Sequence, residues 1–208
     1  MVSHFEFGGV VLEYIRHAGF KVKGTKVIYL DPYQIPKNME KADLILVTHD
    51  HYDHLDLNSI KQIYKEDTVL VAPEGCKLKE IKIQPIKIGQ ELSFGSVKVK
   101  AVPAYNLNKP YHKKGMGVGY VVDIDGVRIY HAGDTDRIPE MKEISVDIAL
   151  LPVGGTYTMD LKEAIAATKD IKAEFFIPMH YGAIPNTAAD VEKFKKEVKN
   201  AVILKPLL

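Results

Sequence analysis

The 208-residue chain has little of what an exported or membrane-bound protein needs. It holds a single cysteine, Cys76, so no internal disulfide bond can form, which suits a reducing compartment. Residues 1–20 show no basic stretch followed by an apolar core, which a secretory signal would have. No apolar run approaches the roughly 18 residues that a membrane-spanning helix requires. These absences predict a cytoplasmic protein with no membrane partner.

The chain also lacks an excess of charge of either sign. Lys and Arg together number 28 and Asp and Glu 27, which leaves a formal charge of +1. Nucleic-acid-binding domains are usually strongly basic, so this balance argues against a nucleic-acid partner. Two lysine-rich stretches, 79–87 and 194–199, fit ordinary solvated faces. The length, and the absence of a linker or repeat, predict one domain over residues 1–208, and the oligomeric state stays open.

Most of the chain has the pattern of β-strands. Alternating or continuous apolar runs rich in β-branched residues favour strands. Gly24 and the Asp125–Gly126 pair fit the turns of hairpins. The expected strands cover residues 10–17, 20–32, 43–49, 68–73, most of 81–131, 146–155, 173–180 and 201–206.

Three segments have the spacing of helices instead. Residues 57–66 follow Asp56 as a possible N-cap, and 160–170 carry Asp160 and Glu163 at capping-box spacing. Residues 187–200 form an amphipathic pattern that Thr187 is expected to cap. Many strands with few helices predict a layered α/β or α+β protein.

The stretch "LVTHDHYDHLD", residues 46–56, gathers three of the eight histidines of the chain. His49 and His51 are two residues apart after a buried strand, so on an extended chain they point to the same side. Asp53 and His54 follow as the chain turns, and they can face a neighbouring position. Imidazole and carboxylate are ligands for Zn²⁺, and also for Mn, Fe or Ni. The motif therefore predicts a metal site.

Two further ligand types follow buried strands later in the chain. Asp134 lies in "YHAGDTD", just past one expected strand, and His180 ends the strand of "FFIPMHYG". Rigid strands give way to adaptable loops at a sheet edge, where functional residues concentrate. We therefore expect Asp134 and His180 to meet the residues of the 49–54 loop at one edge.

These three motifs together resemble the metallo-β-lactamase superfamily. "THDHYDH" matches its HxHxDH signature, and "GDTD" and "PMHYG" match its later aspartate and histidine motifs in the same order. "YIRHAGFKV" is similar to a segment of the branch that holds ascorbate-6-phosphate lactonase-like and N-acyl-phosphatidylethanolamine phospholipase D-like hydrolases. The resemblance covers about residues 10 to 204 and implies a four-layer αββα sandwich with the metals at one edge.

The resemblance also implies roles for single residues. His49 and His51 correspond to a first metal site, the three residues Asp53, His54 and His180 to a second, and Asp134 bridges both. Asp53 is the expected catalytic residue, and a water whose pKa a metal lowers to about 7 is the expected nucleophile. The implied substrate is a small ester, lactone or phosphodiester. A nuclease, or a non-catalytic metal-binding or assembly protein, is the alternative.

One position departs from the family pattern. Where the family usually supplies another histidine for the first site, "VPAYNLNKPYH" offers Asn106. An amide oxygen is a weaker ligand for Zn²⁺ than imidazole is. Either the first site binds metal weakly, so that one ion is held tightly and one loosely, or His112 replaces the missing ligand. The ordinary expectation for His112, in a lysine-rich stretch, is an exposed loop residue.

Four other residues are candidates for supporting roles. His17 and His131 are expected to orient a ligand, although plain packing would explain them as well. Thr156 and Tyr157 lie on a glycine-rich loop after a buried strand, from which they could reach the substrate or simply form a turn. Lysines 109, 113 and 114, around His112, could receive an anionic substrate.

Overall fold

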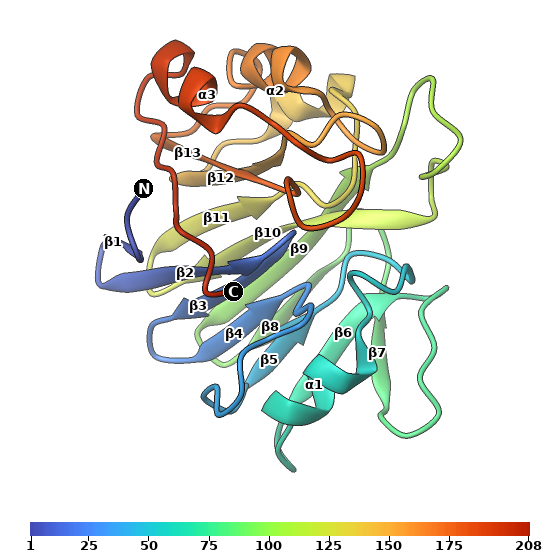
Figure 1. Ribbon diagram of the computed structural model, residues 1–208. Helices are drawn as coiled ribbons and strands as arrows, with labels where there is room; N and C mark the ends of the chain where they lie inside the picture. The colour runs from blue at the N-terminus through green and yellow to red at the C-terminus, as the bar shows by residue number, and fades with distance from the viewer.

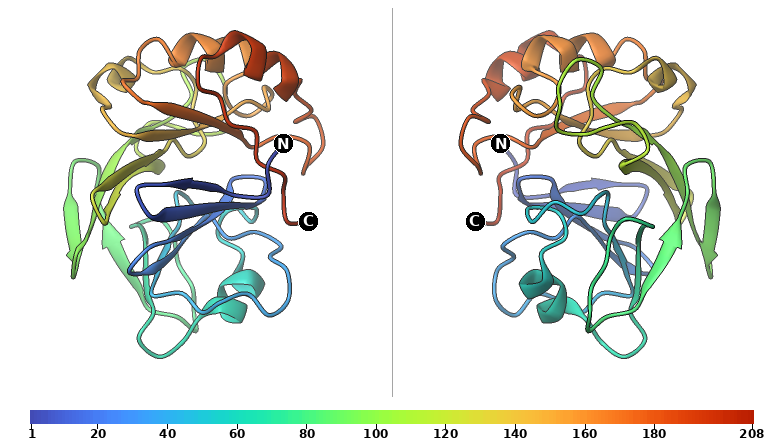
Figure 2. Two further views of the ribbon diagram at one scale, coloured as in Figure 1. Left: turned by 90° about the vertical axis from the view of Figure 1, so that its left-hand side faces the viewer. Right: turned by 90° about the vertical axis from the view of Figure 1, so that its right-hand side faces the viewer.

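The computed structural model describes residues 1–208 and contains two β-sheets packed face to face with helices on the outside (Figure 1, Figure 2). This arrangement confirms the expected αββα sandwich. The first sheet has seven strands in chain order, which are β1 (Phe5–Phe7), β2 (Val10–Arg16), β3 (Gly19–Lys23), β4 (Val27–Leu30), β5 (Leu44–Leu46), β6 (Val69–Pro73) and β7 (Ile83–Ile86).

The second sheet has six strands, also neighbours in chain order. They are β8 (Glu91–Phe94), β9 (Val97–Ala104), β10 (Gly117–Ile124), β11 (Val127–His131), β12 (Ile148–Pro152) and β13 (Phe175–Met179). Ile124 pairs with Val127 across the expected Asp125–Gly126 turn, which confirms that hairpin. Strands β4 to β7 and β11 to β13 run parallel within their sheets. Each parallel set therefore delivers the carboxyl ends of its strands to one edge.

The helices cover the outer faces of the two sheets (Figure 2). They are α1 (Leu57–Ile63), α2 (Leu161–Ala167) and α3 (Val191–Glu197), with a 3₁₀ turn at Pro139–Glu143. Asp56 caps α1, and Asp160 and Glu163 form the expected capping box of α2. None of these helices has the length and apolar character needed to cross a membrane.

Two sequence expectations near the C-terminus are wrong. Asp190, not Thr187, caps α3, because the side chain of Thr187 is buried and donates to the carbonyl of Ile184 instead. Residues 201–206 do not form a strand. They make isolated bridges, from Ala201 to β13 and from Leu204 to Val2, so their pairing is divided between two partners and no ladder develops.

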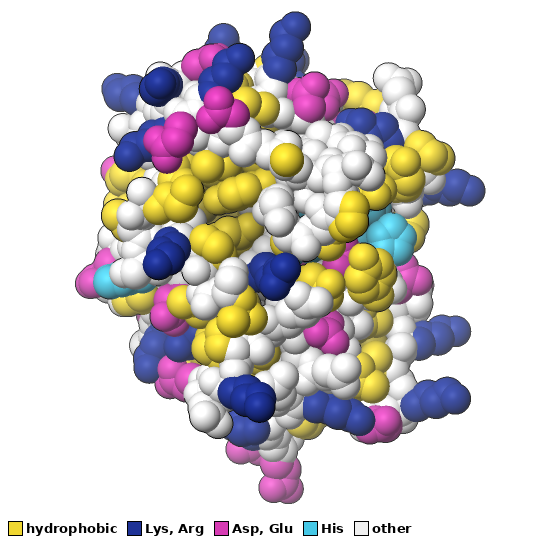
Figure 3. Space-filling view, in the orientation of Figure 1, with side chains coloured by type: hydrophobic (Ala, Val, Ile, Leu, Met, Phe, Trp, Pro, Cys, Tyr) yellow, Lys and Arg dark blue, Asp and Glu magenta, His cyan; other side chains and the backbone are white.

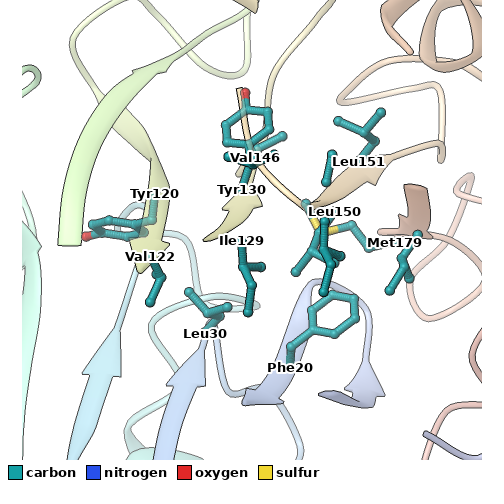
Figure 4. Packing of buried hydrophobic residues seen from close by; sticks show 14 of the residues in the cluster. Phe20, Leu30, Tyr120, Val122, Ile129, Tyr130, Val146, Leu150, Leu151 and Met179 are labelled. Atoms are coloured by element: carbon teal, nitrogen blue, oxygen red, sulfur yellow. The ribbon is translucent and has the colours of Figure 1, made fainter. Parts of the chain in front are cut away.

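The main hydrophobic core fills the space between the two sheets. Phe20 and Leu30 project from the first sheet toward Ile129 and Leu150 of the second (Figure 4). A smaller cluster packs α1 on the outer face of the first sheet, where Tyr29 is completely buried. The strands β4 and β5 are thus buried on both faces, which explains their continuous apolar sequences.

Truncation of a side chain between the sheets should cost much of the stability. Phe20→Ala removes a fully buried ring, and we expect a loss of about 3–5 kcal/mol from the free energy of unfolding. Ile88→Ala, at a side chain that is 42% exposed, should change it by less than about 0.5 kcal/mol. Urea denaturation of both variants measures the difference. Equal stability of the two would contradict this description of the core.

Candidate functional site

Two groups of metal-ligand atoms lie at the edge where the parallel strands end. In the first, His49 Nε2 is 3.0 Å from His51 Nδ1, and His112 Nε2 is 3.2 Å from the same His51 atom. One nitrogen from each of these three rings lies within 4.8 Å of the other two. Three imidazoles that close together can hold one cation.

The second group uses the other half of the motif. Ligand atoms of His17, Asp53, His54 and His180 lie within 4.8 Å of one another. His17 Nε2 donates to Asp53 Oδ2 over 2.9 Å, and His54 Nε2 is 3.9 Å from the same oxygen. The loop turns sharply here, because the backbone N–H of His54 donates to the carbonyl of His51. The turn separates the ligands of the first group from those of the second.

The carboxylate of Asp134 lies between the two groups. Its Oδ2 is 2.9 Å from His180 Nε2 and 3.3 Å from His112 Nε2, and its Oδ1 is 3.4 Å from His54 Nε2. Gly133, with φ +64°, provides the turn that brings Asp134 here, and a Cβ on Gly133 would lie 2.7 Å from the Val118 carbonyl oxygen. The structure therefore brings together the six residues of the three motifs.

The residues fit a cation, because several buried polar atoms in the cluster have no hydrogen-bond partner. His180 Nε2 approaches Asp134 closely but without hydrogen-bond geometry. Buried polar atoms are almost always paired, and a bound ion is one way to satisfy them. The unpartnered atoms are His17 Nδ1, His54 Nε2, Asp134 Oδ1 and both ring nitrogens of His180.

A residue not expected from the sequence, Asp31, fixes the orientation of two imidazoles of the cluster. Fully buried just beyond β4, it accepts from His54 Nδ1, from the Thr48 hydroxyl and from the Thr48 backbone N–H, each over 2.7 Å. Since the Thr48 hydroxyl donates to Asp31, it accepts from His49 Nδ1 over 2.9 Å. Both imidazoles therefore carry their proton on Nδ1 and turn the Nε2 lone pair toward the cluster. Its position in "YLDP", directly after a buried strand, was the available sequence signal.

His112 contributes a ring nitrogen to the first group, while the side chain of Asn106 forms hydrogen bonds with the loop around it. Contrary to the expectation of an exposed loop residue, His112 is only 4% exposed. The Asn106 side chain accepts from the His112 backbone N–H over 2.9 Å and donates to Asp136 and to the Tyr157 carbonyl. His112 Nδ1 lies 3.2 Å from both Asn106 Oδ1 and the Tyr157 carbonyl, so Nε2 faces the cluster. Asn106 thus holds the loop that presents His112.

The other three candidates have different surroundings. His131 is fully buried, with Nε2 donating to the Ala18 carbonyl and Nδ1 accepting from the Gly133 N–H, so it supports the turn before Asp134. The Thr156 hydroxyl donates to the Asn186 carbonyl and is exposed. Tyr157 lines the cavity in front of the cluster.

The backbone at His17 and His180 is in the left-handed region, with φ of 58° and 57°. That conformation is uncommon for residues other than glycine, and it occurs at functional sites as well as in turns. The two residues support each other, because the His180 N–H donates to the His17 carbonyl over 2.6 Å and their ring centroids are 3.9 Å apart. Gly154 makes the room for His180, since a Cβ there would collide with its carbonyl oxygen.

Electrostatics in the cluster keep its central carboxylate ionised. Burial raises the pKa of Asp134, but His180 and His54 outweigh this effect and hold that pKa well below its usual value. Burial opposes protonation of His54, yet Asp134 and Asp31 raise its pKa well above the ordinary range. Burial lowers the pKa of His49 and His112. A cation competes with protons for such nitrogens.

A cavity of about 400 Å³ opens in front of the cluster. This volume lies in the range typical of small-molecule sites. Five of its ten lining residues belong to the cluster, namely His51, Asp53, His112, Asp134 and His180. The cluster is therefore accessible to a small molecule.

Comparison with known proteins agrees with this geometry. The family model of the beta-lactamase superfamily domain matches residues 11–180. The chain is 35% identical over 219 residues to a UPF0173 metal-dependent hydrolase of Thermococcus onnurineus, covering 95% of this chain and 97% of that one. A UPF0173 metal-dependent hydrolase of Pyrococcus furiosus is 36% identical over 221 residues, with the same coverage.

Two solved structures resemble the whole fold. A candidate metal-dependent hydrolase from Parabacteroides distasonis superimposes with a TM-score of 0.88 at 32% identity, over 99% of both chains. Igni18, a metallo hydrolase from Ignicoccus hospitalis, gives a TM-score of 0.81 at 28% identity over 95% of both chains. The chain therefore belongs to the metallo-β-lactamase superfamily, among the UPF0173 metal-dependent hydrolases.

Proposed function

We propose that the protein hydrolyses a small ester, lactone or phosphodiester with a water molecule activated at two metal ions in the histidine–aspartate cluster. The observation that carries this proposal is the position of Asp134. Its two carboxylate oxygens face ligand nitrogens of both groups at 2.9–3.4 Å. A shared carboxylate between two ligand sets is the arrangement that a dinuclear hydrolytic centre needs.

Each group would hold one ion. The first would use His49, His51 and His112, and the second Asp53, His54 and His180, with Asp134 shared. Five imidazoles and two carboxylates favour Zn²⁺, while Mn, Fe and Ni accept the same donors. Because His112 supplies a third imidazole, the sequence-based reason for a weak first site no longer holds. The same finding removes the basis for the non-catalytic alternative, which rested on Asn106.

The bound ions would supply a Lewis acid for the substrate oxygen and lower the pKa of the attacking water to about 7. Asp53 is the residue that can hold this water. Burial raises the pKa of Asp53, but the hydrogen bond from His17 and the charge of His54 outweigh it and lower that pKa to about 2. The carboxylate is therefore an acceptor at neutral pH. His17 fixes its orientation through the 2.9 Å contact to Oδ2.

The segment around His17 bears on the type of substrate, and the spread of the cluster residues along the chain bears on the domain organisation. The "YIRHAGFKV" segment contains His17, and its likeness to the lactonase-like and phospholipase D-like branch supports lactones and phosphodiesters as substrate types. Residues from 17 to 180 enter the cluster, so we propose that residues 1–208 act as one domain.

Metal removal and Asp53→Ala test the proposed function. Chelator-treated protein should lose its turnover of p-nitrophenyl esters, phosphodiesters and lactones, and Zn²⁺ should restore it. Asp53→Ala should lower kcat/KM by at least about 100-fold, because the group that holds the attacking water is lost. Near-normal turnover in a folded, metal-loaded Asp53→Ala variant would show that the carboxylate is structural.

Metal stoichiometry tests the role of His112. The wild type should bind two Zn²⁺ per chain with comparable affinity, and His112→Ala should lose one of them, because two imidazoles then remain in the first group. Asn106→His should not raise occupancy, since it removes the clamp on the His112 loop. Titration of apoprotein with Zn²⁺ measures both. Improved binding in Asn106→His would contradict this assignment.

Asp31→Asn tests the orienting carboxylate. An amide cannot accept all three hydrogen bonds that Asp31 accepts, so His54 and Thr48 should lose their fixed orientation. We expect metal affinity to fall by about 10- to 100-fold, as for other residues that orient ligands. Asp43→Asn is the matched control. Asp43 also accepts from a backbone N–H, that of Val27, but it lies before β5, at the opposite end of the strand. Equal metal affinity in the two variants would contradict the role of Asp31.

A further inference from the structure

The cavity in front of the cluster has a second wall that contains no charge. Its five lining residues outside the cluster are all aromatic or aliphatic, namely Tyr52, Tyr111, Tyr157, Ile184 and Pro185. We infer that the substrate carries an uncharged aromatic or aliphatic group against this wall, which we call the apolar wall. The inference rests on the proposed function, because the cluster is taken to bind the reacting end.

Four separate loops build the apolar wall. Tyr52 comes from the metal-binding motif, Tyr111 from the loop before β10, Tyr157 from the loop after β12, and Ile184 with Pro185 from the loop after β13. Tyr111 and Tyr157 pack edge to face with ring centroids 4.8 Å apart. Such an aromatic pair forms a firm surface on which a flat or aliphatic group can pack.

The solvent exposure of the apolar wall supports its role as a surface that binds part of the substrate. Tyr52 is 69% exposed and Tyr111 is 41% exposed, and both are among the few large hydrophobic side chains that reach solvent. Exposed apolar surface next to a cavity typically marks a binding site. A substrate that covers these rings would remove their apolar surface from water, which favours binding.

Beyond the cluster, the residues that line the cavity supply no cation for an anionic substrate. The cavity lining contains no lysine or arginine. Lys109 is occupied, because it contacts Asp136 over 2.6 Å and the Thr158 carbonyl over 2.8 Å. Lys114 pairs with Glu140 over 3.0 Å. The face drawn in Figure 3 mixes basic and acidic side chains with no large field of either sign.

Charge on the distal part of the substrate would therefore be unpaired. Sites for phosphate or carboxylate groups normally use arginine, lysine or rows of backbone N–H groups. A charged group placed against tyrosine, isoleucine and proline loses hydration without a partner, which is unfavourable. This argument selects uncharged esters or lactones with an apolar body over nucleotides and phosphorylated sugars.

Binding of three carboxylates to the zinc-loaded protein tests the inference. Acetate, hexanoate and adipate share the carboxylate that the cluster would hold, and they differ in the chain and in its distal charge. Hexanoate should bind about 15-fold to 250-fold more tightly than acetate, because each of its four additional methylenes contributes roughly a twofold to fourfold gain when buried. Adipate, with the same six carbons and a second carboxylate, should bind at least tenfold more weakly than hexanoate. Calorimetry gives the three dissociation constants.

Variants of the wall assign the effect to its residues. Tyr111→Ala should reduce the hexanoate-to-acetate preference severalfold while leaving acetate binding unchanged. Ile184→Lys places a cation in the wall and should bring adipate to within about threefold of hexanoate. Ile88→Ala, an apolar truncation outside the cavity, should leave all three constants as in the wild type.

The outcomes separate this inference from the proposed function. Equal binding of hexanoate and adipate, or tighter binding of adipate, would overturn the apolar wall while leaving a metal centre intact. Tighter binding of 6-aminohexanoate than of hexanoate would also overturn it, because the tyrosine rings would then form a cation site. If none of the acids binds the zinc-loaded protein better than the metal-free protein, the proposed metal centre itself fails.

Discussion

The arrangement of the metal-ligand cluster depends on the hydrogen bonds that end at the carboxylate of Asp31. This fully buried group accepts from His54 directly, from the backbone of Thr48, and from the Thr48 hydroxyl, which in turn accepts from His49. One residue after β4 thus sets the proton position on an imidazole of each ligand group. A donor left unpaired in this buried position costs about 1–3 kcal/mol, so each of the three contacts is strongly favoured. The histidine motif supplies the imidazoles, and the hydrogen bonds to Asp31 direct the Nε2 atoms of His49 and His54 toward the cluster.

The cluster also contains backbone strain that the rest of the fold holds in place. His17, Asp31 and His180 all have positive φ, which costs of order 1–3 kcal/mol for each such residue. The His17 carbonyl accepts both the His180 N–H and the hydroxyl of the buried Tyr14, so strain on two loops is fixed by one shared acceptor.

Much of the fold was predictable because local signals agreed with the tertiary structure. Strands that are buried on both faces have continuous apolar sequences, which made them recognisable. The caps at Asp56 and Asp160 were predictable because they depend on contacts within one helical turn. The prediction of the α3 cap was wrong because Thr187 and Asp190 are both residues that favour N-caps. Only tertiary packing determines that the side chain of Thr187 points inward. The burial of His112 was not predictable. It depends on the clamp by Asn106, whose partner Asp136 lies 30 residues away in sequence. The role of Asp31 was not predicted, because an aspartate before a proline is also common in ordinary turns.

The metal-ligand cluster and the apolar wall depend on the fold in different ways. The loops that follow β5, β11 and β13 supply most metal-ligand atoms, and the ladders of the two packed sheets fix where these loops begin. Loops supply the apolar wall, and loops can change in sequence at little cost to the sheets. Two loops serve both parts. The loop after β5 supplies Tyr52 to the wall and its neighbours His51 and Asp53 to the cluster. The loop between β9 and β10 supplies Tyr111 to the wall and His112 to the cluster. Asp136 accepts from Asn106, from Lys109 and from the backbone of Leu107, so the loop is tied down by one buried carboxylate. An insertion or deletion in this loop would therefore shift the wall and His112 together, which couples the choice of substrate to the geometry of the cluster, whereas truncation of the Tyr111 side chain alters the wall alone.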